Sequence, residues 1–364
     1  MKRTTSGVLI AACALTLAGC AATPRPDTGS ASAAAAAMTG AEPLDAALVT
    51  PDFGWVLTAD RLLVSRDGGT TLTPVEVPVQ AGVPRAAYFA DARTGVVAAV
   101  TGETITVAST TDGGTTWRST AVRAPAVSAA GYAALAVSFG DGSHGAILAR
   151  AATSQAFSLG TILATGDGGA SWSAHPAPEA GALLVEPGGR IWLAGTALHS
   201  STDRGRSWAR AELELAGSGE AVTVSPPVAG TVPVTVVTGG RTEVQLLTST
   251  DGGRRWGRPA RLPAVGRTGP GVRLAVAATP GGPVVFDTAA GHAYRRDGTD
   301  LRPAGLPDGV QAVTLTPDGR YGWALAGYGT CRTGKQDCTY HHDLLATTDA
   351  GATWRTTATW ARPA

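Results

Sequence analysis

The chain has little lysine and few cysteines, and it lacks the common catalytic motifs. Lysine occurs only as Lys2 and Lys335 among 364 residues, while 29 basic and 28 acidic residues nearly balance. A near-neutral chain without a basic patch argues against nucleic acid as a partner. There is no G-x-S-x-G elbow, no H-E-x-x-H and no P-loop. We therefore expect neither a cofactor nor a metal.

The four cysteines divide between the two ends of the chain. Cys13 and Cys20 lie near the N-terminus, whereas Cys331 and Cys338 lie near the C-terminus with six residues between them. In an exported protein such a pair predicts a disulfide that closes one loop. The spacing and the lack of a second pair argue against a zinc or C-x-x-C redox site.

The N-terminus has the features of an export signal. Lys2 and Arg3 precede an apolar run, Val8–Ala18, that is too short to span a bilayer, so residues 1–19 are predicted to be a signal peptide. Leu17 to Cys20 resemble the lipobox of bacterial lipoproteins, which implies that Cys20 receives diacylglycerol; an ordinary signal peptide with an incidental cysteine is the alternative. Residues 20–43, rich in Ala, Ser, Thr and Pro, are predicted to form a flexible tether.

This resemblance also implies a location. A lipid on Cys20 would anchor the protein to the outer face of the cytoplasmic membrane. The abundance of Arg, Ala and Gly together with the scarcity of Lys suggests a GC-rich genome, so we expect a Gram-positive bacterium.

A short motif of a hydroxyl, an aspartate, glycines and a tryptophan recurs along residues 44–364. Its copies are SRDGGTTL (65–72), TTDGGTTW (110–117), TGDGGASW (165–172), STDRGRSW (201–208), STDGGRRW (249–256) and TTDAGATW (347–354). Their aspartates are Asp67, Asp112, Asp167, Asp203, Asp251 and Asp349, and a weaker copy around Asp297 makes seven. Such a period, with several short β-branched runs in each repeat, predicts an all-β fold: a seven-bladed β-propeller of four-stranded antiparallel blades.

Tryptophan and apolar residues follow the same period. The first strand of each repeat is expected to lie innermost and to be the most apolar, and the fourth to lie outermost and to be the most polar. Eight of the nine tryptophans occupy two equivalent positions, where we expect them to pack between adjacent blades. Five end a motif copy (Trp117, Trp172, Trp208, Trp256, Trp354), and three lie on second strands (Trp55, Trp192, Trp323).

In the pattern S/T-x-D-x-G-x-S/T-W the chain resembles the Asp-box repeats of sialidases, sortilin-type receptors, some glycoside hydrolases and photosystem II assembly factor-like propellers. The resemblance covers Leu44 to about Trp360 and implies that each motif is the turn between the third and fourth strands of a blade. Asp112 is then expected to accept hydrogen bonds within its turn, and Gly113 and Gly114 to adopt positive φ. The motif is predicted to be structural, and the resemblance specifies the fold rather than an activity.

Glycoside hydrolysis is the enzymatic alternative. The Arg-Ile-Pro motif of sialidases is missing. Hydrolysis of this kind needs two facing carboxylates, whereas acids outside the motif are sparse and many of them, such as Asp91, Asp141 and Asp318, are predicted to lie in turns. We therefore expect no catalysis, with an exo-acting, sialidase-like glycosidase of non-standard site as the alternative.

One segment departs from the repeat. GYGTCRTGKQDCTYHHD, Gly327–Asp343, is predicted to be a long polar loop between the second and third strands of the last blade, on the face opposite the motif. It supplies the candidate partner-binding residues, pre-ordered by the predicted disulfide: Arg332, Lys335, Asp337, Tyr340, His341 and His342. A stabilised loop without a partner is the alternative. The predicted function is a non-catalytic, monomeric envelope lipoprotein that binds a protein or a polysaccharide.

Overall fold

The computed structural model describes most of the chain from Ala36 onward. The described residues are 36–38, 40–82, 84–124, 131–151, 160–215, 219–224, 232–238, 243–262, 274–279, 282–287, 292–295, 301, 305–307, 309–331 and 338–363. The chain divides into two compact units, Met1–Ala34 and Ala35–Ala364, and the first lies outside the described residues together with Cys20 and most of the predicted tether. In the part that is described, no helix is long and apolar enough to cross a membrane.

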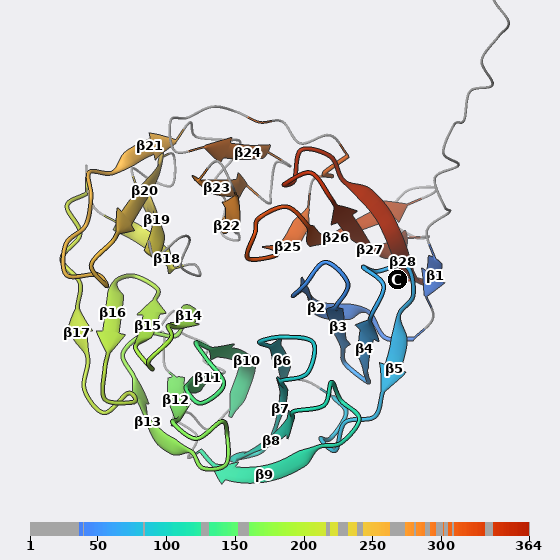
Figure 1. The fold of residues 1–364 in the computed structure, drawn as a ribbon, viewed down its shortest axis with the longest axis horizontal. Coiled ribbons are helices and arrows are strands. Elements are labelled where there is room, and N and C mark those ends of the chain that lie inside the picture. The colour runs from blue at the N-terminus through green and yellow to red at the C-terminus, as the bar shows by residue number, and fades with distance from the viewer. Residues whose placement is uncertain are drawn as a thin grey trace, which may run out of the picture. The chain divides into compact units, whose positions relative to one another are not determined.

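The second unit is a seven-bladed β-propeller, as the repeats predicted. Seven sheets surround one centre, and each has its first strand nearest that centre (Figure 1). Blades 1 to 4 consist of β2 (Pro43–Leu48), β3 (Gly54–Thr58), β4 (Leu62–Ser65) and β5 (Thr73–Val75); β6 (Arg85–Phe89), β7 (Gly95–Thr101), β8 (Thr104–Thr110) and β9 (Arg118–Arg123); β10 (Tyr132–Phe139), β11 (Gly145–Ala151), β12 (Gly160–Thr165) and β13 (Ser173–Ala177); and β14 (Ala182–Val185), β15 (Ile191–Ala194), β16 (Leu198–Ser201) and β17 (Ala209–Arg210).

Blades 5 to 7 complete the ring, and within each blade successive strands pair antiparallel. They consist of β18 (Gly219–Val224), β19 (Val232–Thr238), β20 (Glu243–Ser249) and β21 (Ala260–Leu262); β22 (Leu274–Thr279), β23 (Gly282–Asp287) and β24 (His292–Arg295); and β25 (Val310–Leu315), β26 (Gly322–Cys331), β27 (Cys338–Thr347) and β28 (Arg355–Pro363). The sheet of blade 6 has three described strands, and the weak motif copy around Asp297 lies outside the described residues.

The last blade has a fifth strand that the sequence did not predict. β1 (Ala36–Met38) pairs in parallel with β28, with Ala36 opposite Ala358 and Met38 opposite Trp360. The sequence placed these residues at the end of the tether. Met38 packs against the apolar cluster between blades 7 and 1, and burial of this side chain together with the strand pairing accounts for the order of so short a segment.

The core consists of one apolar cluster at each of the seven blade interfaces. The cluster between blades 1 and 2 contains Phe53, Trp55 and Phe89, and the one between blades 4 and 5 contains Trp192 and Leu247. The remaining interfaces each have an equivalent cluster. The ring is therefore closed by side-chain packing between blades, including blade 7 against blade 1.

The gradient of burial differs in one respect from the sequence expectation. The fourth strands are the most exposed, as predicted, but the second strands are more buried than the innermost first strands. Every side chain of β3 is buried, whereas only three of the six in β2 are. A second strand has neighbours on both sides within its sheet and blades on both faces, whereas a first strand lies at the inner edge of its sheet.

The second-strand tryptophans pack between blades, as the sequence predicted. Trp192 and Trp323 are both 1% exposed. The ring centroid of Trp192 lies 6.0 Å from that of Trp256 in the next blade, at an interplanar angle of 76°. Trp323 of blade 7 approaches Gly69 of blade 1 so closely that a Cβ there would lie 2.9 Å from the indole.

Candidate functional site

The repeated turns, defined as the six segments that contain Asp67, Asp112, Asp167, Asp203, Asp251 and Asp349, follow one hydrogen-bond pattern, which is complete in the copies of Asp112, Asp167, Asp203 and Asp349. In the second copy, Asp112 Oδ1 accepts from the Thr116 backbone N–H at 2.8 Å and from the Thr110 hydroxyl at 2.8 Å. Asp112 Oδ2 accepts from the Thr116 hydroxyl at 2.6 Å. The Trp117 indole N–H then donates to the Gly114 carbonyl oxygen at 3.1 Å. Both carboxylate oxygens are thus occupied by donors of their own turn.

These hydrogen bonds govern the charge of the turn carboxylates. The hydroxyl and backbone N–H of Thr116 lower the pKa of Asp112 from 3.8 to about 2. Those of Ser171 lower the pKa of Asp167 to about 2 in the same way. In the fifth copy Arg255 replaces the hydroxyl residue, so Asp251 keeps the backbone donor at 2.9 Å but has no hydroxyl at this position. The carboxylates are ionised and committed within their turns at neutral pH.

Two copies have a non-glycine residue at the first glycine position of the turn. Arg204 and Ala350 adopt φ of 63° and 61°, where the other copies have glycine at φ near 70°. A side chain with a Cβ is disfavoured in this left-handed region by about 1–2 kcal/mol relative to glycine. The motif tolerates these replacements at a cost in stability.

We expect Ala350→Gly to stabilise the domain by about 0.5–1 kcal/mol, because relief of the left-handed strain exceeds the extra chain entropy of glycine. Urea unfolding measures the difference. Ala352→Gly is the matched control: Ala352 is exposed and does not have positive φ, so that variant should lose stability. A loss of stability in both variants would contradict the interpretation.

A pocket of about 440 Å³ lies between blades 2 and 3, on the same face as the repeated turns. Its lining includes Tyr88, Phe139, Trp117, Asp141 and Asp167. The Tyr88 hydroxyl donates to the Phe139 carbonyl oxygen at 2.7 Å, and Asp141 accepts from the Gly188 backbone N–H at 2.9 Å. Tyr88 and Asp141 therefore already have partners in the protein.

The predicted loop Gly327–Asp343 is in fact largely a β-hairpin. β26 and β27 are ten residues each and pair from Gly322–Thr347 to Cys331–Cys338. The polar, β-compatible residues on both sides of the charged segment continue the ladder of the blade. We call residues 327–331 and 338–343 the extended hairpin. Arg332, Lys335 and Asp337 lie outside the described residues.

The two faces of the extended hairpin carry different side chains. Tyr328 lies opposite His341, and their rings stack at 5.1 Å with an interplanar angle of 15°. The Tyr328 hydroxyl donates to Asp343 Oδ2 at 3.3 Å, so burial and the nearby Asp343 charge raise the pKa of Tyr328. His342 points to the other face, where its Nδ1 lies 3.9 Å from Glu42 Oε2. His341 and His342 are therefore separated, and the described residues contain no cluster of three or more groups that could hold a metal.

The two cysteines lie at the end of the described hairpin. Cys331 and Cys338 are directly opposite in the antiparallel register. Opposed residues in such a ladder have Cα atoms about 4.5–5.5 Å apart, within the range that a disulfide requires. Only the backbone of these two residues is described, so the disulfide stays a prediction.

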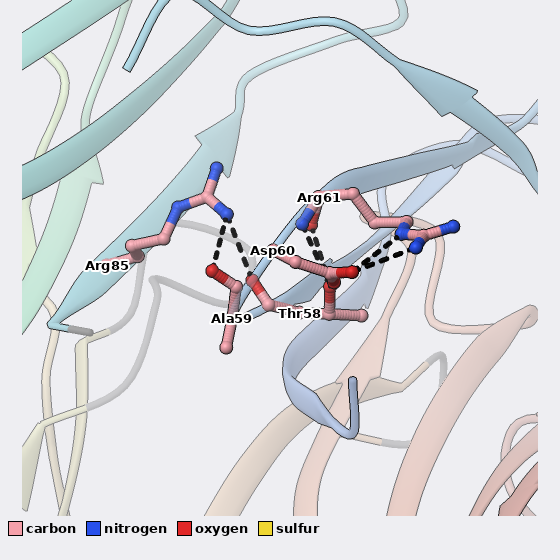
Figure 2. Close-up of polar contacts among 5 residues, drawn as sticks. All are labelled: Thr58, Ala59, Asp60, Arg61 and Arg85. Atoms are coloured by element: carbon pink, nitrogen blue, oxygen red, sulfur yellow. Dashed lines mark hydrogen bonds and ion pairs between the residues drawn. The ribbon is translucent and has the colours of Figure 1, made fainter. Parts of the chain in front are cut away.

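A second pocket, of about 460 Å³, lies between blades 1 and 2 on the face of the extended hairpin, opposite the repeated turns. Figure 2 shows its polar contacts. Arg85 Nη1 donates to the carbonyl oxygens of Thr58 at 3.2 Å and Ala59 at 3.1 Å. Asp60 is held separately by Arg61, whose Nε and Nη2 lie 3.1 and 2.8 Å from Oδ2. Sequence reasoning missed this site, because Arg85 belongs to no motif.

Comparison with solved structures returns proteins of low sequence identity. A structure described as YCF48 bound to D1 peptide is 16% identical, with a TM-score of 0.41, and the match covers 87% of this chain and 81% of that one. YCF48 from Cyanidioschyzon merolae is 14% identical, with a TM-score of 0.38 and coverage of 85% and 83%. An ancestral GH74 enzyme is 12% identical, with a TM-score of 0.42; the match covers 89% of this chain but only 38% of the enzyme.

These similarities concern the fold. No protein-family model matches the chain, and no curated protein matches it. At such identities neither an activity nor a partner transfers to this chain, and function has to be argued from its own surface.

Proposed function

We propose that the protein is a non-catalytic, lipid-anchored binding protein of the cell envelope and that it recognises a protein partner through the extended hairpin. The proposal rests on the exposed aromatic side chains of that hairpin. Among the described residues, the exposed large hydrophobic side chains are Leu44, Tyr328 and Tyr340, at 38%, 41% and 47%. Two of the three lie on the only blade hairpin with ten-residue strands in the described part of the chain.

Tyrosine in this position suits protein recognition. A tyrosine side chain has few rotatable bonds, offers an apolar ring and a hydroxyl, and is enriched where interfaces bury their core. The stacked Tyr328–His341 pair is already held by Asp343, so little conformational entropy is lost when a partner covers it. A disulfide between Cys331 and Cys338 would restrain the tip further.

The anchor follows from the N-terminal pattern. With diacylglycerol on Cys20 the propeller would be attached to the outer face of the cytoplasmic membrane. Metabolic labelling with a radioactive fatty acid tests this part of the proposal: label on the wild-type chain supports the anchor, and an unlabelled, released protein refutes it.

The binding function is tested by capture of partners with the full-length protein from detergent-solubilised envelopes. A specific partner should be retained by the wild type and reduced at least about tenfold by Tyr328→Ala together with Tyr340→Ala, the effect expected when interface aromatics are removed. Tyr321→Ala is the matched control, because Tyr321 lies in the same blade beside the turn between β25 and β26. Equal capture by all three proteins would refute the role of the hairpin.

The same purified protein tests the absence of catalysis. We expect no turnover of a panel of fluorogenic glycosides. Turnover that survives purification and is lost on substitution of a carboxylate would overturn the non-catalytic assignment.

A further inference from the structure

An arginine joins neighbouring blades at two of the repeated turns. Arg66 of blade 1 donates from Nη2 to the Gly113 carbonyl oxygen of blade 2 at 2.7 Å. Arg190 of blade 4 donates from Nη1 to the Gly252 carbonyl oxygen of blade 5 at 2.6 Å. Both acceptors are the first glycine of a repeated turn, directly after its aspartate. In these two places a guanidinium from the preceding blade therefore satisfies the carbonyl of the turn.

Each of these guanidinium groups also lies over an aromatic ring. Arg66 Cζ is 6.0 Å from the ring centroid of Phe53, and Arg190 Cζ is 5.8 Å from that of Trp192. A cation at such a distance is attracted by the negative face of the ring. The protein thus holds a guanidinium between blades with a turn carbonyl and an aromatic side chain.

The repeated turn of blade 3 presents the same acceptor at Gly168. The φ of Gly168 is 70°, compared with 72° for Gly113 and 70° for Gly252. In all three turns the aspartate accepts a hydrogen bond from the backbone N–H four residues further on. Because the turns share this conformation, the Gly168 carbonyl oxygen is expected to face the preceding blade, as its two equivalents do. In the described part of the chain no arginine donates to it.

Threonine replaces arginine at both positions of blade 2 that could supply a guanidinium. Thr111 directly precedes the turn aspartate, where blade 1 has Arg66. Thr94 directly precedes the second strand, where blade 4 has Arg190. Thr94, Thr111 and Gly168 together line the pocket of about 440 Å³ between blades 2 and 3. The shorter side chains therefore leave open, at this interface, the space that an arginine fills elsewhere.

The pocket is accessible from solvent. Thr111 is exposed, and Thr94 and Gly168 are half-buried. Tyr88 is a half-buried lining residue, and its ring stacks on that of Phe139 at 5.9 Å. The volume lies within the range of small-ligand sites. A ligand that enters between the blades can therefore reach both the turn of blade 3 and an aromatic ring.

The charge of the pocket lining favours a cation. Among the described lining residues the carboxylates are Asp141 and Asp167, and Arg118 is the one basic side chain. The Gly188 backbone N–H lowers the pKa of Asp141, and the Ser171 hydroxyl lowers the pKa of Asp167 to about 2. Both carboxylates are therefore ionised at neutral pH, and the negative charges of the lining outnumber the positive one.

We propose that the pocket between blades 2 and 3 binds a guanidinium group on an apolar stem, in the place that Arg66 and Arg190 occupy at two other interfaces. The guanidinium donates to the Gly168 carbonyl oxygen, and the stem lies against the Tyr88 ring. An arginine side chain of a partner protein and a small alkylguanidinium offer the same chemistry. The site lies on the face opposite the extended hairpin and uses none of its residues, so it stands or falls independently of the proposed function.

Titration of the full-length protein with butylguanidinium tests the proposal. We expect the backbone N–H signal of Gly169 to shift in proton–nitrogen NMR spectra, because this N–H shares a peptide bond with the Gly168 carbonyl. Butylurea, the neutral isostere, should cause no such shift, and butylammonium, which lacks the planar fork, should bind more weakly.

A second arm of the titration distinguishes the two sources of the guanidinium. It uses the peptide acetyl-Gly-Arg-Gly-amide. Tighter binding of this peptide than of butylguanidinium identifies a protein side chain as the preferred source, whereas tighter binding of butylguanidinium identifies a small guanidinium compound.

Thr111→Arg should restore the bridge that Arg66 makes and occupy the site from within. Binding of butylguanidinium should fall at least about tenfold, as expected for loss of a charge-assisted hydrogen bond, while the thermal midpoint should not fall. Thr94→Arg, at the position equivalent to Arg190, is a second variant with the same expected loss of binding. Thr202→Arg is the matched control: it places an arginine before the turn aspartate of blade 4, where the carbonyl of the next blade already accepts from Arg190, and should leave binding unchanged.

Three results would overturn the proposal. The first is a shift of the Gly169 signal that is equally large with butylurea, because the site would then not recognise the charge. The second is the absence of any shift when the folded wild type is titrated with butylguanidinium. The third is undiminished binding in whichever of Thr111→Arg and Thr94→Arg keeps the thermal midpoint of the wild type.

Discussion

Replacement of Trp192 by alanine is expected to destabilise the domain by about 3–5 kcal/mol, the range for loss of a large buried aromatic side chain. Trp192 is 1% exposed and belongs to the cluster that joins blades 4 and 5. Its ring fills space that only a glycine opposite leaves free, because a Cβ on Gly253 would lie 2.1 Å from the indole. The substitution therefore opens a cavity at a blade interface that the surrounding strands cannot easily fill.

Urea unfolding followed by circular dichroism measures this loss. Trp192→Phe should cost much less than Trp192→Ala, because the indole N–H has no hydrogen-bond partner and a ring remains in the cavity. Trp256→Ala, at the half-buried partner of the pair, should cost less than half as much as Trp192→Ala. A loss below about 1 kcal/mol for Trp192→Ala would show that the interface repacks, against the expectation for a rigid core.

The propeller could be predicted from the sequence because the same types of residue recur at the same packing positions in each repeat. The motif copies count the blades, and the second-strand tryptophans identify the interfaces where clusters such as that of Trp192 and Leu247 form. The first motif copy ends in Leu72 instead of tryptophan. Leu72 packs in the same cluster as Trp323, whose indole lies against Gly69 of that copy. Packing that repeats from blade to blade therefore leaves a periodic pattern in the amino-acid sequence.

Features that break the period could not be predicted in the same way. Ala36–Met38 look like tether in composition, and they become a strand only because the outer edge of β28 is available for pairing. The segment Gly327–Asp343 looks like a polar loop, yet its flanks continue the β26–β27 ladder. In the first case the deciding partner is a strand at the far end of the chain, and in the second it is the existing ladder of the blade, which the hairpin continues. Local composition reveals neither.

The extended hairpin and the second pocket differ in how far the sequence indicates them. Tyr340, His341 and His342 could be singled out because their segment is longer than its equivalents in other repeats. Arg85 could not, because a single arginine before an apolar run is unremarkable until the ladder places it opposite Ala99 at a level occupied by Pro43 or Val310 in other blades. Comparison of register positions across repeats is the signal that would find such a residue.

Acid unfolding between about pH 4 and pH 2 is the second large effect that we expect. The Thr116 hydroxyl and backbone N–H lower the pKa of Asp112 to about 2, and Ser171 does the same for Asp167. Hydrogen bonds to the turn hydroxyls and backbone also lower the pKa of Asp203 and Asp251. Because the folded pKa values lie below the unfolded value of 3.8, the stabilisation is complete above about pH 4 and is lost as the pH falls towards 2.

Thr116→Ala separates this cause from general acid sensitivity. Loss of the hydroxyl at 2.6 Å should raise the pKa of Asp112 from about 2 towards 3.8, while the backbone donor of residue 116 keeps part of the depression. Thr115→Ala is the matched control, because the Thr115 hydroxyl donates to the Asp112 carbonyl oxygen and not to its carboxylate. Carbon NMR titration of the Asp112 carboxyl carbon measures both variants. If the pKa of Asp112 is the same in both variants, the backbone of the turn alone sets the charge of this carboxylate. A higher pKa of Asp112 in Thr116→Ala than in Thr115→Ala would show that the Thr116 hydroxyl contributes to the resistance of this blade to acid.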